Sequence, residues 1–572
     1  MSARAWVIPR RGGRFPLAVI LWLPTLIFLG LFFFYPLFSI LRLGLSPAQV
    51  ASALVEEGGL IWRVVRFTLW VAGLSTLLTL LVGLPAAYVF AHYRFPGKDV
   101  LRALTTIPFM LPTVVAAAGF NALLGPRGWI NLALMALFHL DRPPIPFLNT
   151  LWAILIAHVF YNTTIVLRIV GNAWAHLDPR LVQAARVLGA DGRRAFWEVT
   201  WPLLRPAILA ASLLVFLFDF TSFGVVLILG GPRYATIEVE IYIQALRMLN
   251  LPLAALLSVI QLLCTLGLTV AYTHLIARII VPTTPRAEAE TARVPRRRGE
   301  RLVILGVVLL LLVLLIAPLI ALVLRSFVQL EPGHPGTREA VHRFTLAYYR
   351  ELFINRRASL FYVPPIMAVR NSFLFALVTV VISLGLGLPT AFLLARRDPL
   401  ARVLDPLLML PLGTSAVTLG LGFLLAFSRP PLAWRTSPWL IPLAHSLVAF
   451  PFVVRTLHPA LASIPERLHE AAAVLGASPW RVWVEVDLPI VARAAVVAAV
   501  FAFTVSMGEF GATSLLARPE YPTIPIAIYR FLSQPGALNY GQALAMATIL
   551  MAVVGVSIVI MERVRLPGVG EF

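Results

Sequence analysis

About a dozen apolar stretches, each long enough to cross a lipid bilayer, dominate this chain of 572 residues. A bilayer core of about 30 Å needs about 20 consecutive apolar residues per helix. The stretch from Phe15 to Leu41, FPLAVILWLPTLIFLGLFFFYPLFSIL, exceeds that length without a charged residue. Hydrophobic residues make up 59% of the chain and charged residues only 13%, which excludes a soluble globular domain of this size. The sequence therefore predicts an all-α protein that spans a membrane many times.

The apolar stretches, read against the glycines, prolines and charges between them, predict twelve spans in two sets of six. The spans are expected at about 16–41, 68–91, 103–125, 148–171, 205–230 and 251–277, then 302–327, 369–395, 405–427, 438–459, 490–517 and 541–562. A segment rich in proline, threonine and charge, VPTTPRAEAETARVPRRRGE, separates the two sets and reads as a linker. We therefore expect a first half at 1–280, a cytoplasmic linker at 281–300 and a second half at 301–572.

The charge pattern predicts the orientation of the chain. A net charge of +21 would suggest a nucleic-acid partner in a soluble protein, but here the 47 basic residues lie in the loops between apolar stretches. That is the positive-inside pattern of membrane proteins, so we expect contact with lipid, no nucleic acid, and both termini in the cytoplasm. The single cysteine, Cys264, excludes a disulfide framework. The first apolar stretch lacks a cleavage site and is expected to be a retained span.

The chain repeats itself with a shift of 287 residues. This shift aligns RLVQAARVLGADGRRAFWEVTWP (180–202) with RLHEAAAVLGASPWRVWVEVDLP (467–489), and 12 of the 23 positions are identical. The same register pairs His158 with His445, and Phe223-Gly224 with Phe510-Gly511. Six spans per repeat give both copies the same orientation, so the halves are parallel repeats around an axis along the membrane normal.

Each repeated segment predicts a short helix, a glycine turn and a second short helix at the cytoplasmic side. Glycine tolerates the left-handed backbone at which a helix stops, and adjacent small alanines let another surface approach closely. One alternative is ordinary helix packing, which two copies in register at a cytoplasmic loop make a poor explanation. DNA recognition by this helix-turn-helix is excluded, because both of its ends continue directly into membrane spans.

These two segments resemble the EAA loop of binding-protein-dependent ABC importer permeases, and the resemblance covers essentially the whole chain as two fused units. It implies the type I ABC importer permease fold in a bacterial inner membrane. In that family the loops, here about 178–203 and 465–490, couple the spans to the ATPase. By resemblance the coupling role falls on Gln183, Ala184, Ala185 and Gly189, and on Glu470, Ala471, Ala472 and Gly476. The first copy departs from the pattern, because Gln183 stands where the motif has glutamate.

The resemblance implies the partners of the chain: two cytoplasmic ABC ATPase subunits and a periplasmic or lipid-anchored solute-binding protein. A chain that hydrolysed ATP itself would need a glycine-rich phosphate loop ending in Gly-Lys-Ser/Thr. The only lysine, Lys98, is followed by Asp99, so we expect ATP to be used by a partner subunit and no cofactor to be bound by this chain. The sequence also lacks HExxH, GxSxG in a suitable context and an acidic metal loop. No catalytic residues and no metal site are expected.

Two acidic residues stand inside predicted spans, where ionisable groups are costly and often functional. They are Asp219, in LFDFTSFG, and Glu509, in SMGEFG. The shift pairs Asp219 with Ser506 and Ser222 with Glu509, so the two acids lie one helical turn apart in the repeat and share a face. We hypothesise that these four residues line a pathway for cations. The alternative is an acid that hydrogen-bonds to neighbouring backbone or pairs with an arginine.

Within the permease family, the segment FTSFGVVLILGGPRYATIEVEIYIQAL (220–246) most resembles the thiamine permeases, which are also fused. Ferric-iron permeases share the fused layout, and since both solutes are cationic, the acids do not separate them. Thiamine is placed slightly ahead of ferric iron, with phosphonates, polyamines and sulfate behind. A secondary transporter driven by an ion gradient would also show repeats and buried acids, but it would not need a repeated glycine-centred cytoplasmic helix-turn-helix.

Overall fold

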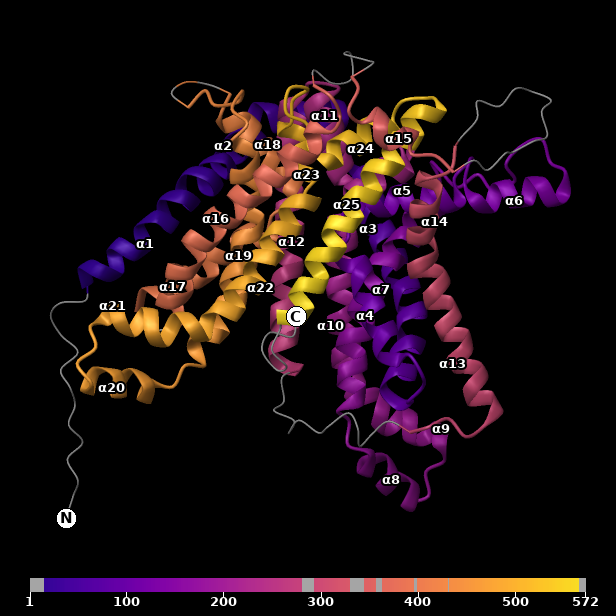
Figure 1. Cartoon of the computed structure of the whole chain (residues 1–572), viewed down its shortest axis with the longest axis horizontal. Helices are drawn as coiled ribbons and strands as arrows, with labels where there is room; N and C mark the ends of the chain where they lie inside the picture. Colours follow the sequence, from indigo (N-terminus) through magenta and orange to yellow (C-terminus); the bar gives the residue numbers. More distant parts are fainter. Residues whose placement is uncertain are drawn as a thin grey trace.

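The computed structural model describes residues 15–279, 293–329, 344–355, 363–395, 399–428, 430 and 432–564. Within these ranges the chain is helical, with two isolated β-bridges and no strand. Most of the predicted linker lies outside the described residues. The helices stand side by side along one direction, with α8 and α20 at one end and α11 and α24 at the other (Figure 1). We call these ends the α8/α20 face and the α11/α24 face.

The two halves contain matching series of helices. In the first half these are α1 (Phe15–Leu29), α2 (Tyr35–Gly44), α3 (Pro47–His92), α4 (Lys98–Met110), α5 (Thr113–Leu124), α6 (Trp129–Phe138), α7 (Leu151–Ala175), α8 (Pro179–Val187), α9 (Gly192–Ala195), α10 (Trp201–Phe220), α11 (Ile237–Leu246) and α12 (Leu251–Ile279). In the second half they are α13 (Arg298–Leu311), α14 (Ala317–Ser326), α15 (Ala347–Glu351), α16 (Met367–Ala395), α17 (Pro399–Met409), α18 (Ala416–Ala426), α19 (Leu440–Ala462), α20 (Glu466–Val474), α21 (Pro479–Val482), α22 (Leu488–Gly508), α23 (Gly511–Leu516), α24 (Ile524–Leu532) and α25 (Ala537–Val564).

Short segments of wider or tighter helix join several of these elements. The π-helical ones are η1 (Gly30–Phe34), η2 (Phe196–Thr200), η3 (Val226–Gly230), η6 (Leu312–Ile316) and η8 (Trp483–Asp487), and the 3-10 helical ones are η4 (Pro232–Tyr234) and η7 (Leu410–Gly413). Because η2 and η8 occupy equivalent places in the repeat, the same local distortion precedes α10 and α22.

Ten helices among the described residues are long and apolar enough to cross a membrane, and two bent helix pairs raise the number to twelve. The spans predicted at about 103–125 and 405–427 each fall on one of these bent pairs. The chain bends by 110° after α4 and by 97° before α18. In the first half Pro112 stands at the bend, directly before α5, and proline cannot continue a helix's hydrogen bonding. In the second half the bend follows the short 3-10 helix η7, which contains Pro411. A count of apolar residues carries no information about such a bend.

The spans predicted at 205–230 and 490–517 are also too long, because α10 ends at Phe220 and α22 at Gly508. The chain then continues as irregular backbone before η3 and α23. Non-helical backbone at membrane depth is tolerated where it is buried in protein or lines a cavity. Both breaks therefore mark places where the backbone is either buried in protein or lines a cavity.

The first span of each half packs against the opposite half. Side chains of α1 and η1, Phe32 and Phe33 among them, are buried in one cluster with residues of α16, α18 and α19. In the reverse direction α14 packs on α5, where a Cβ at Gly119 would lie 2.9 Å from the Pro318 carbonyl oxygen. The equivalent contact of the first-half helix α2 with the second half places Pro36 against Gly422 of α18. The halves are therefore interlocked.

Repeat-related aromatic side chains meet where the halves face each other. The rings of Phe223 and Phe510 stack with centroids 5.4 Å apart and planes inclined by 29°. Each also packs on the related tyrosine, Phe223 on Tyr242 and Phe510 on Tyr529, at 5.5 Å. Two residues related by the repeat can touch in this way only beside the pseudo-two-fold axis.

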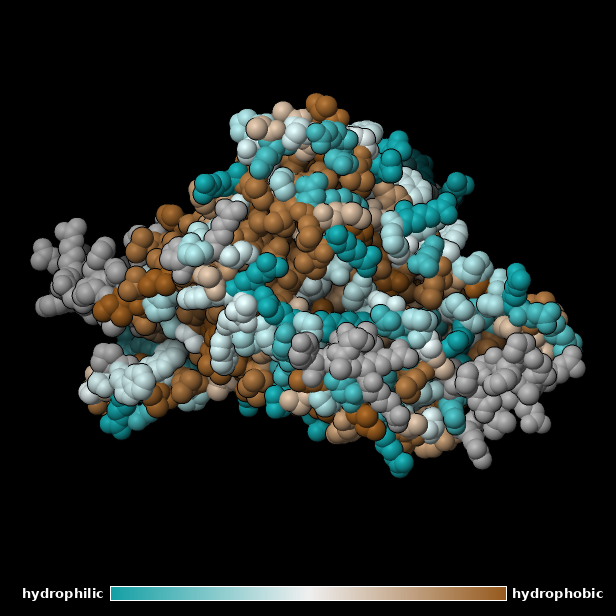
Figure 2. Space-filling model, turned by 90° about the horizontal axis from the view of Figure 1, so that it is seen from above, coloured by the Kyte–Doolittle hydropathy of each residue, from teal (hydrophilic) through white to brown (hydrophobic). Residues whose placement is uncertain are grey.

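Large apolar side chains are exposed along the helices. In a view onto the α11/α24 face, apolar residues form broad brown areas with hydrophilic groups scattered among them (Figure 2). On the helix flanks, Leu81 of α3 is 62% exposed and Val381 of α16 is 71% exposed. Exposed apolar surface of this extent marks contact with lipid or protein partners, as expected for a membrane protein.

Candidate functional site

Two short helices on the α8/α20 face end in the same glycine motif. Gly189 follows α8 with a φ of +92°, and Gly476 follows α20 with a φ of +78°. Behind Gly189, the amide of Ala190 donates to the carbonyl of Ala185 at 3.0 Å. The matching bond in the second half joins Ala477 to Ala472, also at 3.0 Å. These are Schellman caps, in which a residue with positive φ lets two amides satisfy the last carbonyls of a helix.

The helices α8 and α20 expose apolar side chains to an unusual degree. Neither helix contains a buried residue. Val187 and Leu188 are each 87% exposed, and the repeat-related Val474 and Leu475 are 86% and 85% exposed. Gln183, Ala184, Glu470 and Ala471 are exposed, and Ala185 and Ala472 are half-buried. The residues predicted to act in coupling thus lie on two matching surfaces, each of which presents an apolar pair suited to a protein partner.

Each of these helices is joined to a long span through a short, stiff connection. In the first half the chain runs from α8 through α9 and η2 into α10, and Arg194 pairs with Glu198 at 2.9 Å. In the second half Arg481 pairs with Glu485 at 2.8 Å in the same place. Only the second half adds a contact from His469 of α20 to the buried Asp487 at the start of α22, at 2.6 Å. The corresponding first-half residues are Val182 and Thr200.

A central cavity of about 370 Å³ lies beside the aromatic stack of Phe223 and Phe510. The first half contributes lining residues from α4, α7 and α10, from the break after α10 and from α11, and the second half contributes residues next to the starts of α18 and α23. Its polar lining includes His158, Tyr161, Asn162, Asp219, Ser222 and Glu238. Ligand sites in proteins fall in a range of about 300–1,000 Å³.

Asp219 is the acidic side chain at the end of α10 that faces this cavity. It is 2% exposed, and Asn162 donates a hydrogen bond to its Oδ1 at 2.7 Å. The Nδ1 atom of His158 lies 3.3 Å from the same oxygen. The other oxygen, Oδ2, is buried and has no hydrogen-bond partner. An unpaired buried carboxylate oxygen is costly, which makes Oδ2 of Asp219 a candidate contact for a further group.

Glu509 is held very differently, although it too contacts a histidine. The amides of Ala512 and Thr513 donate to its two oxygens at 2.8 and 2.9 Å, and the Thr513 hydroxyl donates as well. The Nε2 atom of His445 lies 3.2 Å from Oε2. This is the alternative arrangement considered for the acids, with the carboxylate bonded to neighbouring backbone. Ser506 bonds to Nδ1 of His445 at 2.7 Å. Neither Ser506 nor Glu509 is among the residues that line the cavity, whereas Asp219 and Ser222 are.

The structure also assigns residues to the cavity that the sequence did not single out. Glu238 is 1% exposed and accepts hydrogen bonds from Gln261 at 2.8 Å and from Ser415 of the second half at 2.7 Å. The sequence does contain a signal for Glu238, because the segment ATIEVEIYI has two acidic residues in an apolar stretch. His158 also lines the cavity, although the sequence shows it only as one of the positions that the repeat preserves. Its repeat-related partner His445 contacts the second acid, and only tertiary structure brings histidine and acid together.

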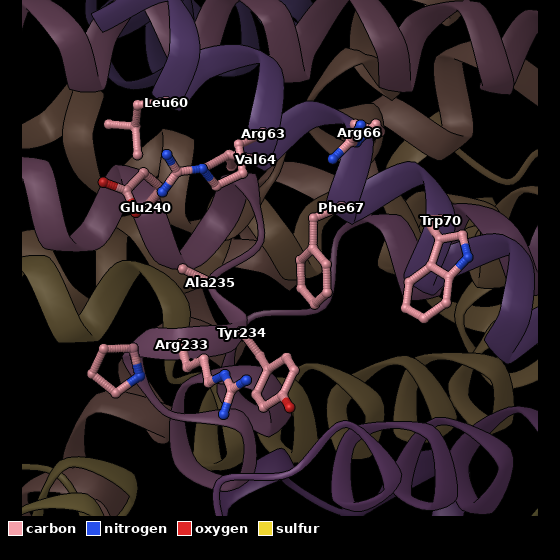
Figure 3. Close-up of a pocket in the computed structure, with 11 residues that line it drawn as sticks. Leu60, Arg63, Val64, Arg66, Phe67, Trp70, Arg233, Tyr234, Ala235 and Glu240 are labelled. Carbon is pink, nitrogen blue, oxygen red and sulfur yellow. The ribbon is translucent and has the colours of Figure 1, made fainter.

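A second cleft, of about 570 Å³, lies beside α11 between α3 and η4 (Figure 3). A row of aromatic rings, Trp70, Phe67 and Tyr234, forms one wall, with neighbouring centroids 6.3 and 6.0 Å apart. The lining residues include three exposed arginines, Arg63, Arg66 and Arg233. At one of these positions the second half reverses the charge, since Arg233 corresponds to Glu520. Glu240 also lines the cleft but is buried, so the three exposed arginines leave the cleft with a net positive charge that suits an acidic partner surface.

The paired helical bundles, the exchanged first spans and the two glycine-capped surface helices define a membrane transport permease with two fused halves. The chain belongs to the family of binding-protein-dependent transport system inner membrane components, whose model matches residues 79–281 and again 366–569. The two matches confirm the fused repeat.

Individual relatives are similar over most of the chain. The thiamine transport system permease protein of Escherichia coli is 28% identical over 87% of this chain and 90% of its own length. The protein of the same name in Brucella abortus is 28% identical over 86% of this chain and 85% of its own length. A Salmonella paratyphi A protein named for 2-aminoethylphosphonate transport is 27% identical over 49% of this chain and 99% of its own length. A relative of that size corresponds to one half.

Proposed function

We propose that this chain is the permease of an ATP-driven importer in a bacterial inner membrane, in which two separate ATPase subunits bind α8 and α20. The observation that carries this proposal is the duplicated, glycine-capped helix with an exposed aliphatic pair, present once per half at the same face. Two equal docking surfaces fit two equal subunits. The α8/α20 face is then cytoplasmic, as are both termini, and the chain itself needs neither an ATPase site nor a cofactor.

The connections behind the docking helices supply a mechanism. Since α8 runs through α9 and η2 into α10, a displacement of α8 reaches the cavity through a continuous helical path that ends beside Asp219. The second half offers the same path from α20 through η8 into α22. Closure of the ATPase pair would draw the two docking helices together and alternate the cavity between the two faces. The solute path passes Asp219 and Ser222, with Ser506 and Glu509 bracing the facing wall through His445.

For the solute we favour thiamine, delivered by a periplasmic or lipid-anchored binding protein to the α11/α24 face. The names of the relatives and the two acidic side chains of the cavity support this choice. Ferric iron is the second candidate because it is also cationic. The arginine-lined cleft of Figure 3 is where we expect acidic side chains of the binding protein to dock.

Substitution of the capping glycines tests the coupling role. Valine disfavours the left-handed backbone of Gly189 and Gly476 by about 1–2 kcal/mol, so in Gly189→Val and Gly476→Val the docking helices should lose their defined ends. We expect co-purification of the cognate ATPase to fall about tenfold, because a free-energy change of about 1.4 kcal/mol is a tenfold change in binding.

Gly267→Val is the matched control, because nothing lies within 4 Å of a Cβ added at that helical position. It should retain the ATPase. Solute uptake into proteoliposomes that contain no ATPase would contradict the proposal and point to a gradient-driven transporter.

A further inference from the structure

The central cavity takes its polar lining from one half of the molecule only. Every described lining side chain that can form a hydrogen bond belongs to the first half. The second half contributes Ala416, Val417, Gly508, Phe510 and Gly511. We propose that this cavity is an intramembrane binding site, present once per transporter, for a planar organic cation. This inference rests on the import function proposed above and adds the location and chemistry of the site.

The charge of the cavity selects for a cation. Two carboxylates, Asp219 and Glu238, line it, and no lysine or arginine does among the described residues. Glu238 has both oxygens occupied by Gln261 and Ser415, whereas Asp219 keeps Oδ2 unpaired and buried. Low dielectric strengthens such an interaction, because opposite charges attract more strongly away from water. Oδ2 of Asp219 is therefore the atom that meets the positive group of the ligand.

The contacts around Asp219 hold that oxygen in place. Asn162 and His158 both approach Oδ1, and the His158 ring is itself fixed by Ser75 at 2.8 Å and by Ser222 at 2.9 Å. Because Oδ1 is anchored on one side, Oδ2 is turned to the other. His158 and Asn162 are thus positioning residues, and Asp219 is the residue that contacts the ligand.

Aromatic rings supply the rest of the surface. Phe109 and Phe218 pack edge to face with centroids 6.0 Å apart, and Tyr161 and Phe223 lie in the same lining. A cation within about 6 Å of an aromatic face is attracted by the ring quadrupole, and proteins recognise quaternary ammonium groups in this way. Flat aromatic walls also fit a planar ring system better than a flexible polyamine.

The second half has lost the corresponding groups. Under the 287-residue shift, Asp219 corresponds to Ser506, Glu238 to Pro525, Asn162 to Ala449 and Tyr161 to Val448. The histidine is kept as His445, but its acid, Glu509, is bonded to backbone amides and lies outside the lining. One ligand per transporter follows, bound on the first-half side of the pseudo-two-fold axis.

An organic cation fits this site better than a metal ion. Among the described residues no three His, Cys, Asp or Glu side chains converge closely enough to hold a metal. One free carboxylate oxygen amid aromatic rings instead suits a diffuse charge on a large ligand.

Equilibrium binding tests the site. The full-length chain in lipid nanodiscs, without ATPase, is titrated with radiolabelled thiamine as the probe. We expect one thiamine per chain, and about tenfold or more weaker binding in Asp219→Asn, because a hydrogen bond to a charged group is lost. Asp219→Glu keeps the charge and should recover part of the affinity. An uncharged aminopyrimidine should compete about tenfold less well than thiamine itself.

The control is Asp405→Asn, which removes a carboxylate of α17 that does not line the cavity and should leave thiamine affinity within about twofold, checked by thermal melting for an intact fold. The proposal is overturned if unmodified chain binds no thiamine at millimolar concentration, if Asp219→Asn binds like the unmodified chain, if Asp405→Asn weakens binding as much as Asp219→Asn, or if ferric ion competes as well as thiamine. ATPase co-purification is measured on the same samples. Loss of ATPase binding with thiamine binding intact would refute the import proposal alone.

Discussion

Asp219 and Glu509 show how the same side-chain chemistry serves two purposes. Both contact the repeat-related histidines, from positions three residues apart in the repeat. Glu509 accepts hydrogen bonds from two amides and a hydroxyl at the start of α23, so the fold stabilises its carboxylate. Asp219 has one oxygen held and one oxygen free. The hydrogen bonds around each carboxylate, and not its charge, separate the structural acid Glu509 from Asp219, the acid that we propose binds the solute.

This difference predicts opposite effects on stability. Glu509→Ala leaves two buried amides without an acceptor, which we expect to lower the free energy of unfolding by about 2–3 kcal/mol. Asp219→Asn removes a charge whose Oδ2 has no partner and should leave stability unchanged or raise it. Thermal melting of the two purified variants in the same detergent measures both. Equal losses of melting temperature would contradict the assignment.

The acids themselves could be found from the sequence, because a charge in an apolar stretch is conspicuous. Their surroundings could not. The pairing of Asp219 with Asn162 and His158 joins α10 to α7, and no local pattern predicts which faces of these two helices meet. Glu238 was missed for a related reason, since its partners lie on α12 and at the start of α18.

At the scale of elements, α8 and α20, which we propose as the docking helices for the ATPase, are the part whose local form the sequence predicted best. Their structure depends on neighbouring residues in the sequence, because one short segment contains the amphipathic stretch, the glycine at positive φ and the second helix. The bends in the third span of each half could not be predicted, for the converse reason. Their stretches are apolar throughout, and the direction of the chain after Pro112 or Pro411 depends on what each helix packs against.

The two docking helices differ in one tether, and this difference is testable. His469→Ala removes the 2.6 Å bond that ties α20 to the buried Asp487 at the start of α22. We expect α20 to move more freely and solute-stimulated ATP hydrolysis in proteoliposomes to fall. The matched change in the first half is Val182→Ala, which breaks no such bond and should have little effect. The interpretation fails if both variants behave like the unmodified transporter.

At the scale of the whole molecule, the exchanged first spans make the halves interdependent. The spans α1–α2 complete the second half, and α13–α14 complete the first. The sequence repeat predicted two units, and the family match confirmed them. Hydropathy could not show that the first span of each unit packs on the other unit. All apolar spans look alike until their packing partners are known.

Interlocking predicts the outcome of dividing the chain. If the protein is cut within 281–300 and the two pieces are produced together, each piece should find its exchanged span on the other, and the pieces should co-purify from detergent. Either piece produced alone should melt at a lower temperature or aggregate, because the groove for the missing span is left open. A first half that is as stable alone as in the pair would refute the exchange.

The aliphatic pairs on the docking helices also have a consequence for the cell. Val187, Leu188, Val474 and Leu475 stand almost fully in water when no other protein covers them. Surplus copies of this chain would therefore present exposed apolar patches of the kind that quality-control proteases and chaperones recognise. If the proposed ATPase covers these patches, production of the two proteins in balance would protect the permease, and an excess of permease would be degraded faster.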